Sequence, residues 1–262
     1  MIKLVITDVD GTLLDNESTL PELNKQAITA CREKGVGVIL ATGKSIAAIQ
    51  SLIKILRLEL PQITLGGAVI VNRRLEVINS VRILPKQFYK VIKTIKEKGY
   101  KPLIARSNGN ILYDEYDPRY SVFKKINEPI FKVKKLEDPV FALDCVSISV
   151  TINESDPLDR FLRDKFSETM QLVRSGEYFF DVLSKQATKG NALSFICKNL
   201  NINKDEVAVF GDSPNDLSMF EFASLRIAPK NSYSEVLKKA DFITEENFNS
   251  GFAKALYKYI LF

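Results

Sequence analysis

The 262-residue chain contains no histidine and no tryptophan, and only three cysteines, Cys31, Cys145 and Cys197. The lack of histidine excludes Ser-His-Asp hydrolases, Cys-His proteases and histidine-based general acid–base chemistry. The cysteines are far apart and form no CxxC pair, so they indicate neither a zinc finger nor a disulfide framework. Any metal ion must therefore be held mainly by oxygen atoms, which favours Mg²⁺.

Long apolar runs are also missing. The longest clean run, near residues 36–41, is much shorter than the ~18 residues that a membrane-spanning helix needs. No secretory leader pattern precedes the first patterned segment. We therefore expect a cytoplasmic protein without a membrane partner. Its 45% hydrophobic and 26% charged residues are typical of a globular chain that buries a core without disulfides.

The excess of positive charge is small. Lys and Arg number 37 against 32 Asp and Glu, a net charge of +5, which is too low to indicate a nucleic-acid partner. Residues 82–139 nevertheless hold 11 Lys and 3 Arg against 7 acids, a net of +7, so the remainder carries −2. A basic segment beside an acidic remainder suits an anionic substrate. A solvated lysine-rich surface explains the same pattern equally well.

Both ends of the chain alternate short apolar runs with segments of helical periodicity. Strands are expected at 3–10, 36–41, 63–65, 68–71, 206–210, 225–228 and 242–243, and helices at 21–34, 45–56, 189–200, 215–223 and 232–240. This alternation favours an α/β fold, a Rossmann-like doubly wound parallel sheet with helices on both faces.

The middle of the chain has a different pattern. Helices are expected at 85–98 and 157–166, and strands at 102–105, 110–113 and 141–152, with a hairpin of 170–174 and 178–183 across Gly176. Mixed strands of this kind predict an α+β insert. We therefore divide the chain into a discontinuous core, residues 1–82 and 186–262, and an inserted cap, residues 83–185.

Acidic residues follow two of the expected core strands. Asp8 and Asp10 come at the end of the first strand, where residues i and i+2 point to the same side. Asp212 and Asp216 follow the strand 206–210 in the same way. The carboxyl ends of parallel strands form the ligand-binding edge of such a sheet, and like charges that close need a cation or a proton. Taken singly, each motif is equally compatible with helix capping.

Two further motifs lie at expected strand or helix ends. Ala41-Thr42-Gly43 follows the second strand and can offer a hydroxyl and backbone N–H groups to an anion, or be a plain turn. Lys189 opens the helix 189–200, where a positive charge opposes the helix dipole, so another benefit is implied. A solvated lysine is the simpler alternative.

The order of these motifs along the chain resembles the haloacid dehalogenase-like phosphohydrolase superfamily. The resemblance is carried by Asp8-Val9-Asp10-Gly11-Thr12-Leu13-Leu14, Ala41-Thr42-Gly43, Lys189-Gly190 and Gly211-Asp212-Ser213-Pro214-Asn215-Asp216. The large insert resembles the α/β cap of the Cof-type sugar-phosphatase branch.

The resemblance implies a role for each matching residue. Asp8 would be the nucleophile, and Asp10 the general acid and then the base. Thr42 and Lys189 would bind the phosphoryl oxygens. The remaining roles concern the metal: Mg²⁺ would be held by Asp8, the main-chain carbonyl of Asp10 and Asp212, with support from Asn215 and Asp216.

The chain departs from the family pattern on the substrate side. Lys44 stands where the Cof-type branch usually has Arg, and a lysine lacks the bidentate fork of a guanidinium group. Gly66-Gly67-Ala68 stands where Asn-Gly-Ala is frequent. We take Gly43, Lys44 and Gly67 as candidate substrate contacts. In the cap, any of Arg106, Asn108, Lys124, Lys125 and Arg174 is a candidate reader of the organic part of the substrate.

The resemblance thus implies a Mg²⁺-dependent phosphatase that hydrolyses small phosphorylated metabolites, sugar phosphates foremost, through an aspartyl-phosphate. Two alternatives stay open. A phosphomutase or phosphotransferase uses the same intermediate, and a non-enzymatic receiver-like phosphoacceptor uses a similar cluster of Asp, Thr and Lys. The sequence leaves open whether the protein is a monomer or a homodimer.

Overall fold

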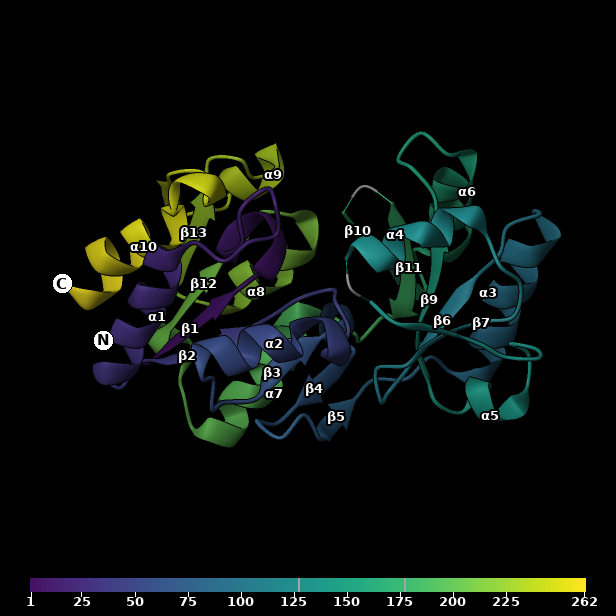
Figure 1. Ribbon diagram of the computed structural model, residues 1–262, viewed down its shortest axis with the longest axis horizontal. Coiled ribbons are helices and arrows are strands. Elements are labelled where there is room, and N and C mark those ends of the chain that lie inside the picture. Colours follow the sequence, from purple (N-terminus) through teal and green to yellow (C-terminus); the bar gives the residue numbers. More distant parts are fainter. Residues whose placement is uncertain (127, 177) are drawn as a thin grey trace.

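The core of the fold is a five-stranded sheet in the order β14-β13-β12-β1-β2, in which every neighbouring pair is parallel. The computed structural model describes residues 1–126, 128–176 and 178–262. The strands are β1 (Leu4–Thr7), β2 (Gly37–Leu40), β12 (Val207–Phe210), β13 (Leu225–Pro229) and β14 (Phe242–Thr244). The two ends of the chain therefore build one sheet, with the first strand between β12 and β2 (Figure 1).

Helices cover both faces of this sheet because successive side chains on a strand point to opposite sides. Val5 packs with α1 (Glu22–Glu33), α2 (Ile46–Leu56) and α10 (Gly251–Leu256). Leu4 and Ile6 pack on the other face with α7 (Lys189–Leu200), α8 (Leu217–Phe222) and α9 (Ser234–Leu237). The expected doubly wound α/β fold is confirmed.

A smaller antiparallel sheet extends the core beyond β2. It consists of β3 (Gln62–Thr64), β4 (Val69–Val71) and β5 (Val77–Ser80), and a parallel bridge between Ala41 and Ile63 joins it to the end of β2. The exposed edge strand β5 was not expected from the sequence. Its short run Val-Ile-Asn-Ser is largely solvent-facing, so it lacks the apolar alternation of a half-buried strand.

The third sheet lies wholly in the middle of the sequence, in the order β10-β11-β9-β6-β7-β8. Its strands are β6 (Leu103–Arg106), β7 (Ile111–Tyr113), β8 (Ile130–Lys132), β9 (Cys145–Thr151), β10 (Met170–Ser175) and β11 (Phe179–Ser184). Only β7 and β8 pair in parallel. The expected hairpin of β10 and β11 is present, and residue 177 in its turn lies outside the described residues.

Helices pack mainly on one face of this third sheet, which forms a second lobe (Figure 1). Helices α3 (Pro85–Glu97), α5 (Pro139–Ala142) and α6 (Pro157–Phe166) share an apolar cluster with Ile148 and Val150 of β9. The short α4 (Ser121–Lys125) lies on the opposite face, where Phe123 joins a cluster that includes core residues Leu65 and Val69. The opposite face of the sheet is thus the one that meets the core.

Two of the expected segments have other bounds in the structure. The strand expected at 141–152 begins only at Cys145, because Pro139–Ala142 forms α5, capped by the Asp138 side chain. The helix expected at 232–240 is regular only over Ser234–Leu237. No helix of the described part of the chain is both long enough and apolar enough to span a bilayer.

Candidate active site

Asp8 lies at the carboxyl end of β1, the strand flanked by β12 and β2. Its backbone N–H donates to the Phe210 carbonyl oxygen at 3.0 Å, which continues the parallel pairing by one residue. The chain then turns sharply through Val9–Leu13. The Asp8 side chain is 9% exposed, so the carboxylate lies at the edge of the sheet with little access to water.

Lys189 balances part of this buried negative charge. Its Nζ lies 2.8 Å from Asp8 Oδ1 and 2.6 Å from Asp216 Oδ1, and the side chain is 1% exposed. Burial alone would lower the pKa of Lys189, but the two carboxylates raise it above its ordinary value, so the ammonium group stays charged. The unfavourable place of this lysine in the first turn of α7 is thus explained by its two ion pairs.

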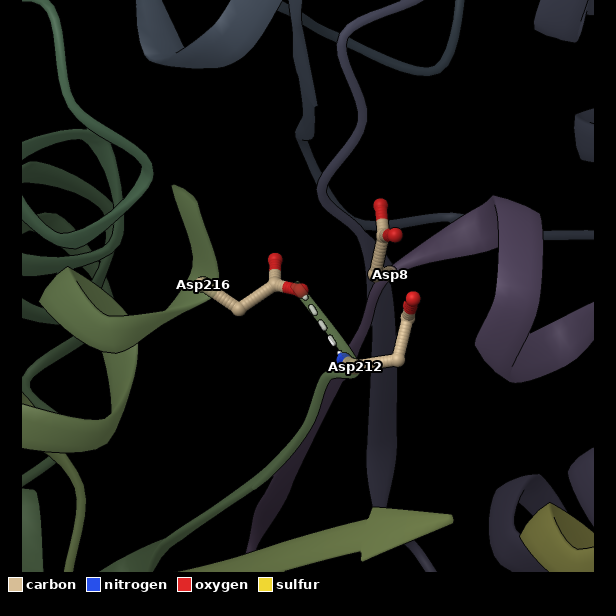
Figure 2. A group of neighbouring side chains, drawn as sticks. All are labelled: Asp8, Asp212 and Asp216. Carbon is tan, nitrogen blue, oxygen red and sulfur yellow. Dashed lines mark hydrogen bonds between the residues drawn. The ribbon is translucent and has the colours of Figure 1, made fainter. Parts of the chain in front are cut away.

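Asp212 and Asp216 come from the turn after β12. Asp216 is fully buried, and its Oδ2 accepts from the backbone N–H of Asp212 at 3.0 Å (Figure 2). The same oxygen accepts from the backbone N–H of Ser213 at 3.1 Å. Asp212 Oδ1 accepts from Thr12 Oγ1 at 2.7 Å, a contact between residues 200 positions apart. Asp216 therefore shapes the turn, while Asp212 is held against the chain that follows β1.

The three carboxylates form one group. Asp8, Asp212 and Asp216 each offer an oxygen, and these atoms all lie within 4.8 Å of one another (Figure 2). Burial raises the pKa of Asp8 well above its ordinary value, and the charges of Asp216 and Asp212 add to the rise although Lys189 opposes it. Burial, followed by the charge of Asp216, raises the pKa of Asp212 to about 6.

Three carboxyl groups thus lie beside a single ammonium group, so the cluster holds more acidic groups than cations. The repulsion between crowded anionic oxygens is relieved when they bind one hard divalent cation together. All the donors are carboxylate oxygens, the ligands that Mg²⁺ prefers. The residues present therefore fit the expected Mg²⁺ site.

Asp10 is placed differently from the other acids. Its side chain is 49% exposed and forms an ion pair with Lys44, with 3.2 Å between Lys44 Nζ and Asp10 Oδ1. The structure thus brings together two predicted site residues, Asp10 and Lys44, on the open side of the cluster. The Asp10 side chain is not part of the three-carboxylate group, and the metal contact of its main-chain carbonyl stays a prediction.

Thr42 and Gly43 lie in the turn between β2 and α2. Thr42 is 1% exposed, its Oγ1 accepts from the Lys44 backbone N–H at 3.1 Å, and its carbonyl oxygen accepts from Gly66. A Cβ on Gly43 would lie 3.1 Å from Ser175 Oγ of the third sheet. The loop is thus held by the core on one side and bounded by β10 on the other.

Two predicted residues, Gly67 and Asn215, contact segments that carry other site residues. Gly67 has φ +98°, and a Cβ there would lie 2.3 Å from the Thr188 carbonyl group, so a glycine lets this turn contact the start of α7. Asn215 Oδ1 accepts from Ser213 Oγ at 2.6 Å within the turn that carries Asp212 and Asp216. The substrate contact of Gly67 and the support of Lys189 by Asn215 stay predictions.

Sequence reasoning assigned no role to Gly11, Thr12 or Glu128. Gly11 has φ +75°, and a Cβ there would lie 2.6 Å from Asp212 Oδ2. The only sequence signal for Gly11 and Thr12 was their position directly after Asp10. Glu128, from the segment before β8, accepts from the Ser45 N–H at 3.0 Å and is 6% exposed. No local pattern marks it, because its partner lies 83 residues away.

Comparison with known proteins settles the family. The model of the haloacid dehalogenase-like hydrolases matches residues 5–256 of this chain. The chain belongs to that family. It is an enzyme of the hydrolase type, and the resemblance drawn from the four motifs is confirmed.

Relatives of this hydrolase match it over nearly their full length. Phosphatase YwpJ of Bacillus subtilis is 27% identical over 96% of this chain and 98% of its own. The 5-amino-6-(5-phospho-D-ribitylamino)uracil phosphatase YwtE of the same bacterium is 26% identical, with 96% of each chain covered.

Solved structures of similar hydrolases share the fold. BT1666 from Bacteroides thetaiotaomicron, described among the phosphatases of the haloalkanoate enzyme superfamily, is 25% identical with a TM-score of 0.85, covering 100% of this chain and 96% of its own. A HAD/COF-like hydrolase from Plasmodium vivax is 20% identical with a TM-score of 0.88, covering 98% and 95%. The α/β core with an inserted second lobe is therefore the common architecture.

Proposed function

We propose that this hydrolase is a Mg²⁺-dependent phosphatase of small phosphorylated metabolites, sugar phosphates among them, and that it acts through an aspartyl-phosphate on Asp8. The observation that supports this most is the buried Asp8 carboxylate at the edge of the sheet, 2.8 Å from the charged Lys189 and within 4.8 Å of two further carboxylates. Membership of a hydrolase family removes the non-enzymatic phosphoacceptor from the alternatives.

In this proposal Mg²⁺ is held by Asp8, Asp212 and the main-chain carbonyl of Asp10, with Asp216 beside them. Bound there, it supplies positive charge that offsets the repulsion between a carboxylate and a phosphate dianion. Lys189 supplies a second, permanent positive charge through its ion pair with Asp8. Asp216 holds the Lys189 ammonium group in place through its own ion pair.

The reaction divides into two displacements at phosphorus. In the first, an Asp8 oxygen forms a bond to phosphorus, the ester P–O bond breaks, and Asp10 gives its proton to the departing alcohol. In the second, Asp10 takes a proton from water as that water attacks, the bond to Asp8 breaks, and inorganic phosphate leaves. Thr42 and Lys189 hold the phosphoryl oxygens throughout. The half-exposed position of Asp10 suits a group that must reach both the alcohol and water.

We also propose that residues 83–185 form a cap distinct from the core of residues 1–82 and 186–262. This division is supported by the six-stranded sheet, because all its strands lie between Leu103 and Ser184. Gly43, Lys44 and Gly67 remain the proposed contacts on the core side. A small anionic phosphorylated substrate would bind between the two parts.

The test is phosphate release from p-nitrophenyl phosphate and from a panel of sugar phosphates. We expect turnover that needs Mg²⁺, is lost with EDTA and returns when Mg²⁺ is added. Asp8→Asn should abolish it, and the acid-quenched wild-type peptide that carries Asp8 should gain one phosphoryl group. Undiminished turnover in Asp8→Asn would overturn the mechanism. An isomerised sugar phosphate in place of free phosphate would favour the phosphomutase alternative.

A further inference from the structure

The cap sheet turns one face toward the core, and this face is mainly apolar. Leu103, Val173 and Leu183 on it share a cluster with the core residue Leu65, and Leu183 lies 3.5 Å from the position of a Cβ on Gly66. Side chains two residues apart on a strand lie on the same face. Asp181 of β11 therefore belongs to the core-facing side, in an apolar setting.

Asp181 has hydroxyl partners and no basic one. Ser149 Oγ, from the directly opposite position on β9, donates to Asp181 Oδ1, and the Ser175 hydroxyl is its other hydrogen-bonding neighbour. No ion pair of Asp181 is found among the described residues. Burial raises its pKa. A carboxyl group without a cation in such a place is costly unless further donors reach it.

A second observation, on the same face of the cap sheet as Asp181, indicates an absent hydrogen-bonding partner. The Ser147 hydroxyl, two residues from Ser149 on the same face of β9, is buried at 4% exposure and has no partner in the described structure. Buried hydroxyl groups are normally satisfied, so the Ser147 hydroxyl indicates a ligand that brings its own hydrogen-bonding groups.

The two candidate cap arginines are engaged elsewhere. Arg174 pairs with Asp159 at 2.8 Å, and Arg106 pairs with Asp144 at 3.0 Å; the candidates Lys124 and Lys125 are exposed on α4. Ser175, in contrast, borders Gly43 beside Thr42, so the Asp181 group adjoins the loop proposed to bind phosphate. The strands β9, β10 and β11 thus present acceptors and hydroxyls beside that loop, despite the net positive charge of residues 82–139.

We propose that Asp181, Ser149 and Ser147 form a subsite for hydrogen-bond donors on the leaving alcohol. The preferred substrates then carry hydroxyl or ammonium groups there and no second anionic group. This inference rests on the proposed phosphatase function and adds to it the chemistry of the leaving group.

Two probes of nearly equal shape test the proposal: glucitol 6-phosphate, whose far end is an alcohol, and gluconate 6-phosphate, whose far end is a carboxylate. At mildly alkaline pH we expect wild type to prefer glucitol 6-phosphate at least tenfold in kcat/KM, because a carboxylate would face Asp181 in a poorly hydrated site. Asp181→Asn removes that charge, and the preference should fall to about threefold or less.

The ratio of the two substrates does not depend on how much of the variant is folded, since both are measured on one preparation. Asp114→Asn is the matched control, because the Asp114 side chain is a buried cap carboxylate at 7% exposure and is paired with Lys96, not with a candidate substrate contact; its ratio should equal that of wild type. Equal ratios in wild type and Asp181→Asn would overturn this inference alone. Failure of wild type to hydrolyse p-nitrophenyl phosphate and both probes would overturn the proposed function, and this inference with it.

Discussion

The core and the cap both place carboxyl groups at their interface, but they balance the charge in different ways. In the core, Lys189 lies between Asp8 and Asp216 with ion-pair distances of 2.8 and 2.6 Å. In the cap, Asp181 is held by serine hydroxyls. A fixed cation suits the phosphoryl group, which every phosphate ester shares, whereas an acceptor without a cation suits the organic part, which varies between substrates. The comparison thus separates the residues proposed to act on the phosphoryl group from those proposed to select the substrate.

The largest effect should come from removing the core cation. Lys189→Met leaves the buried Asp8 and Asp216 carboxylates without their cation, and breaking such a pair costs about 3–5 kcal/mol. We expect that loss in the free energy of unfolding from urea titration, together with a fall in kcat of about 10²–10³. Lys198→Met, an exposed lysine of the same helix, should change neither quantity. A Lys189→Met variant as stable as wild type would show that the core charges are balanced in another way.

A comparison of two glycine substitutions isolates the effect of packing against Asp212 in the core site. Gly11 and Gly35 both have φ +75°, but a Cβ would meet Asp212 only at Gly11 and meets nothing within 4 Å at Gly35. Gly35→Ala should cost about 1 kcal/mol for the backbone conformation alone. Gly11→Ala should cost about 1–3 kcal/mol more from the clash, measured by urea unfolding. Equal losses would mean that Asp212 moves aside freely.

The smallest effect concerns one of the contacts between the two parts, the hydrogen bond from the Ser45 N–H to Glu128. Burial raises the pKa of Glu128 above its value in the unfolded chain. Its contribution to stability is therefore complete below the unfolded pKa and lost as the pH rises through the folded pKa. The unfolding free energy of wild type should fall relative to Glu128→Gln as the pH is raised from about 4 to about 7. A difference that grows in favour of wild type would reverse the sign and contradict the burial of this carboxyl.

The sequence predicted best those features that depend on local pattern. The helix Lys189–Leu200 has the expected bounds, since its N-terminal Thr and apolar periodicity are local signals. The acids after β1 and β12 meet because parallel strands end at one edge. The contact between Thr12 and Asp212 and the ion pair of Asp10 with Lys44 depend on the distances between separate chain segments, which no local pattern encodes.

The cap was harder to predict for a physical reason. Its net charge suggested basic groups facing the substrate, but charge counted along the chain does not tell which face of a sheet carries it. In the fold, Arg174 and Arg106 pair with cap carboxylates, and the face toward the core holds Asp181. Strand alternation shows this only after the register of β9 and β11 is known.

The central claim is that aspartates from the two ends of the chain share one Mg²⁺. Isothermal titration calorimetry with Mg²⁺ alone, on wild type and Asp212→Asn, tests it without relying on turnover. The account predicts one site per chain in wild type and an affinity at least about tenfold lower in the variant, because one charged ligand becomes a neutral amide. Equal affinities for Mg²⁺ in the two proteins would contradict a cation shared between Asp8 and Asp212.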